Sequence, residues 1–109
     1  MTPVKIYIAG PMTGLPEYNL PAFAAAAVEL ESLGYEVTNP GRHGVIEGFT
    51  WQDYVRRGLI ELLACDAIAL LDGWESSRGA KLEVQVAETL FGYEMVRPIE
   101  EWIAMRAVA

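Results

Sequence analysis

The order of strand-like and helix-like segments along the chain is the feature that most limits its fold. Apolar, β-rich runs at residues 4–10, 35–39 and 66–73, with a weaker run at 94–98, are separated by amphipathic segments at about 20–33, 51–65 and 79–91. A final helical segment covers residues 99–107. Strands that alternate with helices form βαβ units, which place the strands in a parallel sheet and the helices on both of its faces. We therefore predict an α/β fold, a three-layer sandwich around a parallel sheet of four to five strands.

The composition fits one compact domain over residues 1–109. Hydrophobic residues make up 52% of the chain and charged residues 21%, and no repeat or low-complexity tract interrupts it. Domains most often have roughly 100–150 residues, so a chain of this length forms one core. The net charge of −7 argues against a surface for nucleic-acid polymers, which needs clustered Lys and Arg. A small anion needs only a local patch, which Arg56, Arg57 and Arg78 could supply.

The sequence shows no sign of a membrane segment, a disulfide or a metal centre. Its longest apolar run is short, and no basic start precedes an apolar signal core, so we expect a cytoplasmic protein that has no membrane partner. Cys65 is the single cysteine and cannot form an intrachain disulfide. We recognise no cluster of metal-ligating residues, and we expect no cofactor.

Unusual loops follow the three main strand segments. Gly10 ends the first, Asn39 ends the second, and Asp72 leads out of the third. In open parallel sheets, ligands bind beyond the carboxyl ends of the strands, near a reversal in strand order. The Gly-rich connection at 40–49 is long enough to suggest a role beyond linking two elements. We therefore expect a pocket at this rim of the sheet.

Glu83 is an acidic residue on an otherwise apolar face of a helical segment. At about 100° per residue, it falls on the same arc as Ala80, Val84 and Ala87. A carboxylate is rarely buried without a partner, because removing a charge from water is costly. Glu83 could interact with the helix dipole or pair with Arg78 for stability. We favour a carboxylate that faces a pocket at the rim, since glycine and serine cluster just upstream.

The segment "SSRGA" before Glu83 is a candidate anion site. Ser76 or Ser77 could simply cap the helix that follows. Exposed N–H groups at a helix start also bind anions, and hydroxyl groups and Arg78 would strengthen that site. Capping and phosphate binding can share these atoms.

Aromatic residues near the rim supply further candidates. Tyr7 lies in the middle of the first strand, so its side chain points to the face opposite to its two isoleucine neighbours. Its hydroxyl could be satisfied within the core, or it could orient Glu83. Trp51 and Trp74 flank the same rim, where either could stack on a base or pack in the core.

The motifs resemble those of a known family. The stretches "KIYIAGPMTG", "CDAIALL" and "GWESSRGAKLEVQVA" are similar to the small, often phage-encoded domains related to nucleoside 2-deoxyribosyltransferases. The resemblance spans nearly the whole chain, and the last stretch is its most specific part. It implies a flavodoxin-like variant of the Rossmann-type fold, assembled as a homodimer or a larger homo-oligomer with sites near subunit contacts. It also implies a nucleoside or nucleotide as the small-molecule partner.

The resemblance assigns roles to particular residues. Gly79 and Glu83 match a G-x-x-x-E pattern whose glutamate attacks the anomeric carbon, so Glu83 is the expected nucleophile and Tyr7 the residue that positions it. Serine six residues before the nucleophile is typical of relatives that hydrolyse 5′-monophosphates, and this chain has Ser77. The expected substrate-binding and phosphate-binding residues are thus Gly10, Ser77, Arg78 and Gly79.

Position 58 departs from the family pattern. Relatives commonly carry an aspartate there, eight residues before Asp66, that helps to protonate the leaving base, but this chain has Gly58. The helical projection places Gly58 on the inward face with Val55 and Leu62, so the missing carboxylate would have pointed at the site. Loss of a general acid costs roughly 10²–10⁴-fold in rate. Asp53 could substitute for that acid, but it projects to another face.

We therefore expect an enzyme that cleaves or exchanges the N-glycosidic bond of a 2′-deoxynucleoside or its 5′-monophosphate. The reaction would pass through a glycosyl ester on Glu83. The alternative is a nucleotide-binding protein of the same fold whose catalysis is impaired because Gly58 replaces the acid. A third reading is an oligomeric interaction protein whose tryptophans serve assembly.

Overall fold

The computed structural model of the protein describes residues 4–107, and these contain one sheet of four parallel strands. The strands are β1 Lys5–Ala9, β2 Glu36–Thr38, β3 Ala67–Leu70 and β4 Val96–Pro98. Their order across the sheet is β2-β1-β3-β4, and β1 pairs with both β2 and β3. The strand order reverses beside β1, and ligands bind at such a switch point in α/β folds. The predicted parallel sheet is confirmed.

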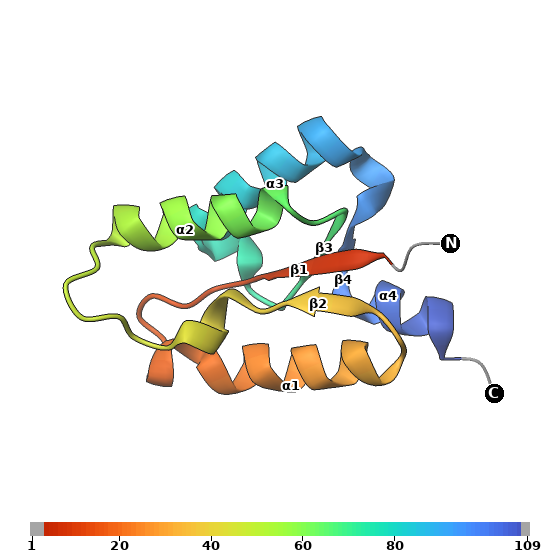
Figure 1. Ribbon diagram of the computed structural model, residues 1–109, viewed down its shortest axis with the longest axis horizontal. Coiled ribbons are helices and arrows are strands. Elements are labelled where there is room, and N and C mark those ends of the chain that lie inside the picture. Colours follow the sequence, from red (N-terminus) through yellow and green to blue (C-terminus); the bar gives the residue numbers. More distant parts are fainter. Residues whose placement is uncertain (1–3, 108–109) are drawn as a thin grey trace.

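Helices cover both faces of this sheet. They are α1 Leu20–Ser32, α2 Trp51–Leu63, α3 Arg78–Phe91 and α4 Ile99–Arg106. Figure 1 shows α1 and α4 on one side of the sheet and α2 and α3 on the other. The expected three-layer α/β sandwich is therefore confirmed.

The alternation of side chains along β1 divides the core into two layers. Ile6 and Ile8 pack with Phe23 and Trp102 in the layer between the sheet and the α1/α4 pair. Tyr7 points the other way and packs with Leu62 in the α2/α3 layer. Successive side chains of a strand point to opposite faces, so the predicted direction of Tyr7 is confirmed. The position of Tyr7 beneath α2 and α3 is what brings its hydroxyl to the site.

Residues of the types that commonly end helices flank α1, with Asn19 before it and Gly34 after it. Gly34 follows the last turn of α1 with a φ of +87°, the left-handed conformation expected of a C′ glycine. Asn19 precedes the helix, and asparagine is favoured at that position, but its side chain does not cap the helix. Its Nδ2 instead donates to the Pro11 carbonyl oxygen at 2.9 Å. This bond ties together the two ends of the loop between β1 and α1.

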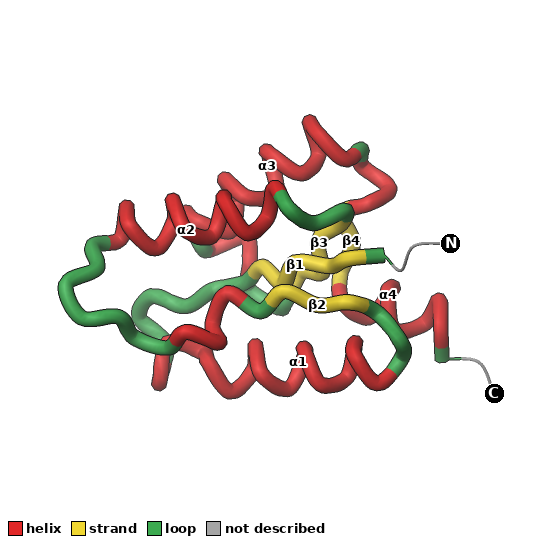
Figure 2. The backbone as a smooth tube through the Cα atoms, viewed as in Figure 1, coloured by secondary structure: helices red, strands yellow, loops and turns green. Residues whose placement is uncertain are grey.

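The connection between β2 and α2 forms an outer wall at the carboxyl rim of the sheet. It begins with a 3₁₀ turn, Pro40–His43, and continues as a loop that runs out beyond the strands (Figure 2). The Tyr54 hydroxyl holds this loop, because it accepts from the Ile46 N–H at 2.8 Å and donates to the Ile46 carbonyl at 3.2 Å. Gly10, Asn39 and Asp72 follow the carboxyl ends of β1, β2 and β3 on this rim, as expected.

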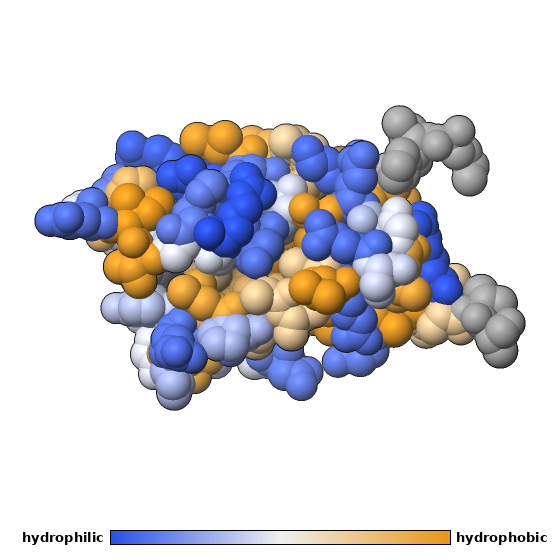
Figure 3. All heavy atoms as spheres, turned by 60° about the horizontal axis from the view of Figure 1, so that its bottom comes forward, coloured by the Kyte–Doolittle hydropathy of each residue, from blue (hydrophilic) through white to orange (hydrophobic). Residues whose placement is uncertain are grey.

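The surface carries apolar residues in scattered positions. Figure 3 shows hydrophobic side chains interspersed with hydrophilic ones on the face seen there. Val28 on α1, Ile60 on α2 and Leu90 on α3 are among the exposed large hydrophobic residues. Within residues 4–107, no helix combines the length and the apolar character needed to cross a membrane.

Candidate functional site

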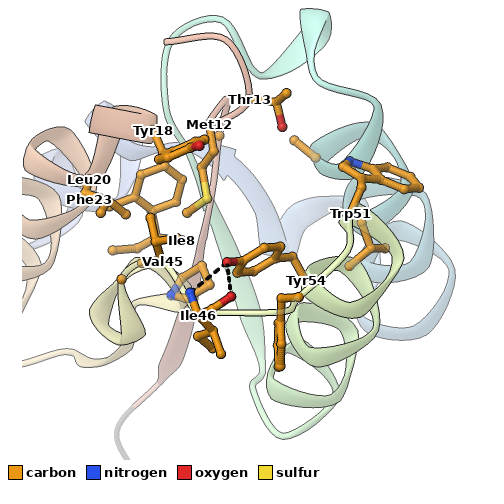
Figure 4. A pocket seen from close by; sticks show the side chains of 18 of the residues that line it. Ile8, Met12, Thr13, Tyr18, Leu20, Phe23, Val45, Ile46, Trp51 and Tyr54 are labelled. Atoms are coloured by element: carbon orange, nitrogen blue, oxygen red, sulfur yellow. Dashed lines mark hydrogen bonds between the residues drawn. The ribbon is translucent and has the colours of Figure 1, made fainter. Parts of the chain in front are cut away.

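A cavity of about 480 Å³ opens at the carboxyl rim of the sheet. Its walls come from the end of β1, the loop before α1, the connection between β2 and α2, and the first turns of α2 and α3. In the view of Figure 4, Tyr18 stands on one side of the cavity and Trp51 on the other, with Tyr54 between them. Gly10 and Gly79, both predicted site residues, belong to the lining, as do Tyr7 and Glu83.

Glu83 is buried, and among the described residues only one of its two carboxylate oxygens has a hydrogen-bond partner. The side chain lies in the second turn of α3 and is 9% exposed. The Tyr7 hydroxyl donates to Glu83 Oε2 at 2.5 Å. Within residues 4–107, Glu83 Oε1 receives no hydrogen bond, yet no fully buried side-chain oxygen is left unpaired. Oε1 therefore has access to the cavity that Glu83 lines.

The structure decides against the ion-pair explanation for Glu83. Arg78, the arginine considered as its partner, instead places its guanidinium 3.7 Å from the centre of the Trp51 ring. Among residues 4–107, no salt bridge involves Glu83. The carboxylate on the apolar face of α3 thus points to a cavity and a tyrosine, as the favoured interpretation required.

Both members of the Tyr7–Glu83 pair are electrostatically perturbed. Burial raises the pKa of Glu83 from 4.5 to about 7, the hydrogen bond from Tyr7 lowers it, and the nearby Glu61 carboxylate raises it. Burial, followed by the charge of Glu83, raises the pKa of Tyr7 well above its ordinary value. Tyr7 therefore stays protonated and acts as a hydrogen-bond donor at neutral pH. A titratable carboxyl whose pKa lies near neutrality in a cavity is typical of a functional group.

Gly58 lies against this pair, on the face of α2 expected from the sequence. The helical projection correctly faced Gly58 toward the site. However, a Cβ atom at this position would lie 2.7 Å from Glu83 Oε2 and 2.8 Å from the Tyr7 hydroxyl oxygen. There is no room for the aspartate of the family pattern while Tyr7 and Glu83 keep this arrangement. Gly58 is thus a point of close approach between α2 and the pair, not a vacant position for an acid.

The other candidate for that acid is already engaged. Asp53 Oδ2 accepts from the Thr50 backbone N–H at 2.9 Å, and the Thr50 hydroxyl accepts from the Asp53 N–H at 3.2 Å. This reciprocal pair is a capping box at the start of α2. Asp53 therefore stabilises the helix start and does not line the cavity.

Ser77 and Arg78 lie beside the cavity, not in its lining. The Ser77 hydroxyl accepts from the Ala80 backbone N–H at 3.1 Å and caps α3, the outcome expected from sequence alone. Arg78 is exposed and stacked on Trp51. The structure thus brings Tyr7, Gly10, Gly79 and Glu83 together, and it leaves the predicted phosphate-binding role of Ser77 and Arg78 a prediction.

The loop after β1 was expected at the pocket, whereas the aromatic lining residues Phe49 and Tyr54 were missed by sequence reasoning. Met12 and Thr13 come from the loop after β1, and Phe49 and Tyr54 from the connection and from α2. Phe49 packs edge-on against Tyr54, with ring centres 5.1 Å apart. The length of the connection signalled a role, but nothing local showed which of its side chains would face inward. Within the part of the chain that the structure describes, no three His, Cys, Asp or Glu residues gather as metal ligands.

Comparison with known proteins identifies the family. The family model described as "Domain of unknown function (DUF4406)" matches residues 4–96, which include both strands that pair with β1 and the whole of α3. The chain belongs to this family. No curated protein matches the chain.

The raised pKa of Glu83 predicts how the stability of the protein depends on pH. The folded state keeps a proton that the unfolded chain loses, so the free energy of unfolding should fall as pH rises from about 4.5 to about 7. Glu83→Gln removes this ionisation. The variant should therefore gain stability relative to the wild type between pH 5 and pH 8, by roughly 3 kcal/mol. Denaturant titrations at the two pH values measure the difference.

Glu75→Gln is the control for this measurement, because Glu75 is exposed. Its stability relative to the wild type should change little over the same pH range. If the stability of Glu83→Gln relative to the wild type changed as little as that of the control, the Glu83 carboxyl would ionise without destabilising the folded state. That result would contradict the raised pKa.

The contact at Gly58 predicts a specific effect of adding one methyl group. Gly58→Ala should push the Glu83 carboxylate toward the cavity and toward water. Because burial is the largest effect on the pKa of Glu83, that pKa should fall from about 7 toward 4.5. Carbon NMR titration of labelled glutamate carboxyl groups measures it. Gly79→Ala is the control, since a Cβ there would meet Val55 Cγ2 at 3.6 Å, an ordinary contact. An unchanged pKa in Gly58→Ala would contradict the proposed contact.

Proposed function

We propose that this member of the DUF4406 family cleaves or exchanges the N-glycosidic bond of a 2′-deoxynucleoside or its 5′-monophosphate. One observation carries the proposal: a buried carboxylate on a rigid helix has one oxygen held by a tyrosine and the other open to a cavity. This is the arrangement of an oriented nucleophile. The resemblance to nucleoside 2-deoxyribosyltransferases, in which the matching glutamate attacks the anomeric carbon, supports it.

The reaction would proceed in two displacements at C1′ of the sugar. Glu83 Oε1 attacks C1′, and the electron pair of the C1′–N bond leaves with the base, which forms a glycosyl ester. A water molecule or a second base then attacks C1′ from the side that the first base left, and the Glu83 carboxylate departs. Because each displacement inverts C1′, the product keeps the configuration of the substrate.

Tyr7 would position Glu83 during both steps. Its hydrogen bond to Oε2 fixes the carboxylate plane, so that Oε1 is the oxygen that faces the sugar. The ester that forms at Oε1 leaves Oε2 as a carbonyl oxygen, which still accepts the bond from the protonated phenol. Tyr7 is therefore a positioning residue, and its own proton does not move.

The cavity is suited to a nucleoside in size and character. Its volume of about 480 Å³ lies within the range of small-molecule sites, roughly 300–1,000 Å³. Aromatic side chains such as Tyr18, Phe49 and Trp51 contribute surfaces on which a base could stack. The first turn of α3, through Gly79 and Ala80, also borders the cavity. A 5′-phosphate would be directed there, toward the positive end of the helix dipole and toward Arg78 at the rim.

We also propose that the protein acts in the cytoplasm as a homodimer or a larger homo-oligomer. The resemblance supports assembly, as do the exposed apolar residues Ile60 and Leu63 on α2 and Leu90 on α3. The acidic net charge of −7 is consistent with a small-molecule partner in place of a nucleic-acid polymer.

A second candidate function is nucleotide binding without turnover. It is favoured by Gly58, which supplies no acid at the position where relatives carry the aspartate that helps to protonate the leaving base. Such a protein would keep the cavity and the Tyr7–Glu83 pair but release no base.

Chromatography of free base distinguishes these functions. The protein is incubated with 2′-deoxynucleosides, including base-alkylated ones, and with their 5′-monophosphates. We expect base release by the wild type and none by Glu83→Ala. Tyr7→Phe should lower the rate by roughly 10- to 100-fold, because hydrogen bonds to charged groups contribute about 1.5–3 kcal/mol.

Tyr35→Phe is the matched control for Tyr7→Phe. Tyr35 is also a buried tyrosine, but its hydroxyl donates to the Trp102 carbonyl in the opposite layer of the core. Its rate of base release should equal that of the wild type. Base release that survives in folded Glu83→Ala would overturn the proposed mechanism, whereas saturable stabilisation by nucleosides without release would favour the binding protein.

A further inference from the structure

We propose that the leaving group of the substrate is a positively charged heteroaromatic base, which departs without a proton from the protein. This inference rests on the proposed function and narrows it to a class of N-glycosides. The charge resides on the base before cleavage, as in a purine deoxyriboside alkylated at N7 or a deoxyribosyl pyridinium. Two independent observations support it, one about acids and the other about the lining of the cavity.

The first observation is that, within residues 4–107, no uncommitted acid lines the cavity beside the nucleophile. Glu61 is near enough to raise the pKa of Glu83, but it is paired with Arg42 at 3.0 Å and lies outside the lining. Gly58 supplies no side chain, and a Cβ there would lie 2.7 Å from Glu83 Oε2, so an acid at this position would displace the Glu83 carboxylate. The Tyr7 hydroxyl is committed to Glu83, and the Tyr54 hydroxyl both accepts from and donates to the Ile46 backbone. A neutral base needs a proton as it leaves, and an acid that supplies this proton raises the reaction rate roughly 10²–10⁴-fold. A base that is already cationic leaves as a neutral molecule and needs none.

Two other titratable side chains line the described part of the cavity, Glu47 and Tyr18. Both are exposed, and they lie on the connection to α2 and on the loop before α1. Neither comes from the elements that hold the Tyr7–Glu83 pair, which are β1 and α3. A general acid has to reach the leaving nitrogen while the nucleophile reaches C1′, so these peripheral positions fit a binding role better.

The second observation concerns the charge and chemistry of the lining. Among the described residues, the lining contains the carboxyl groups of Glu47 and Glu83 and no Lys, Arg or His. Opposite charges attract strongly in a cavity that partly excludes water. The lining also presents the aromatic rings of Tyr18, Phe49 and Tyr54, whose faces attract cations by cation–π interaction. A planar cation satisfies both features, whereas a neutral base uses only the stacking surfaces.

The chemistry balances without an added acid. Glu83 Oε1 supplies the electron pair for the bond to C1′, and the pair of the C1′–N bond neutralises the positive ring. Water then attacks C1′, Glu83 leaves as a carboxylate, and the proton of the water passes to solvent. The sum of the two steps is a cationic N-glycoside plus water, which gives a neutral base, the free sugar and one proton.

The test compares two substrates that differ in charge. Release of 7-methylguanine from 7-methyl-2′-deoxyguanosine and of guanine from 2′-deoxyguanosine are followed by chromatography, each corrected for spontaneous hydrolysis. We expect kcat of the wild type to be at least about 100-fold higher for the methylated substrate, because a general acid contributes a rate factor of that order and none is available for the neutral base. Rates within a few-fold of each other would overturn the inference, because they would require an acid in the site.

Glu47→Gln separates binding of the cation from proton donation. We expect this variant to raise KM for the methylated substrate several-fold without a change in kcat. A selective loss of kcat for 2′-deoxyguanosine would instead identify Glu47 as an acid and overturn the inference. If neither substrate released base, the proposed function itself would fail, whereas equal release from both would leave that function intact.

Discussion

The hydrogen bond between Tyr7 and Glu83 connects the sheet to α3 at the point where the cavity begins. It is formed under α2, whose backbone at Gly58 comes so close that a side chain there would displace the pair. Three elements that are distant in the sequence, β1, α2 and α3, therefore meet at the Tyr7 hydroxyl oxygen and Glu83 Oε2. Because Tyr7 and α2 lie against Oε2, the remaining oxygen of Glu83 is the one available to the cavity that this side chain lines.

The same enclosure explains why the site is chemically unusual. Burial stabilises the neutral form of Glu83 and brings its pKa to about 7, while the bond from Tyr7 favours the ionised form. The result is a carboxyl group that ionises near neutral pH and is poorly solvated when it does. A carboxylate in that state is a better nucleophile than one in water, and its burial costs the folded protein stability. Stability given up at one rigid position for the sake of function is common in proteins.

Much of the site could be predicted where the relevant physics is local. The period of α3 and the cost of burying a charge singled out Glu83, and strand alternation gave the direction of Tyr7. Other features depend on tertiary distances. The helical projection faced Gly58 toward the site, but only the packing of α2 showed that a side chain there would displace the Tyr7–Glu83 pair. Asn19 is of a residue type that often caps helices, yet its side chain donates to the Pro11 carbonyl. Which residues of the β2–α2 connection face inward depends on the hydrogen bond between Tyr54 and Ile46.

The proposed role of Glu83 as a nucleophile is tested most directly by trapping its ester. A substrate with 2-deoxy-2-fluoro-arabinose as its sugar and 7-methylguanine as its base would react once, and the fluorine would slow the loss of the sugar. Intact-mass measurement after acid quenching should show the mass of one fluorinated sugar added to the protein, and peptide mapping should place it on Glu83. An adduct on another residue, or base release with no adduct at any time, would contradict a covalent role for this carboxylate.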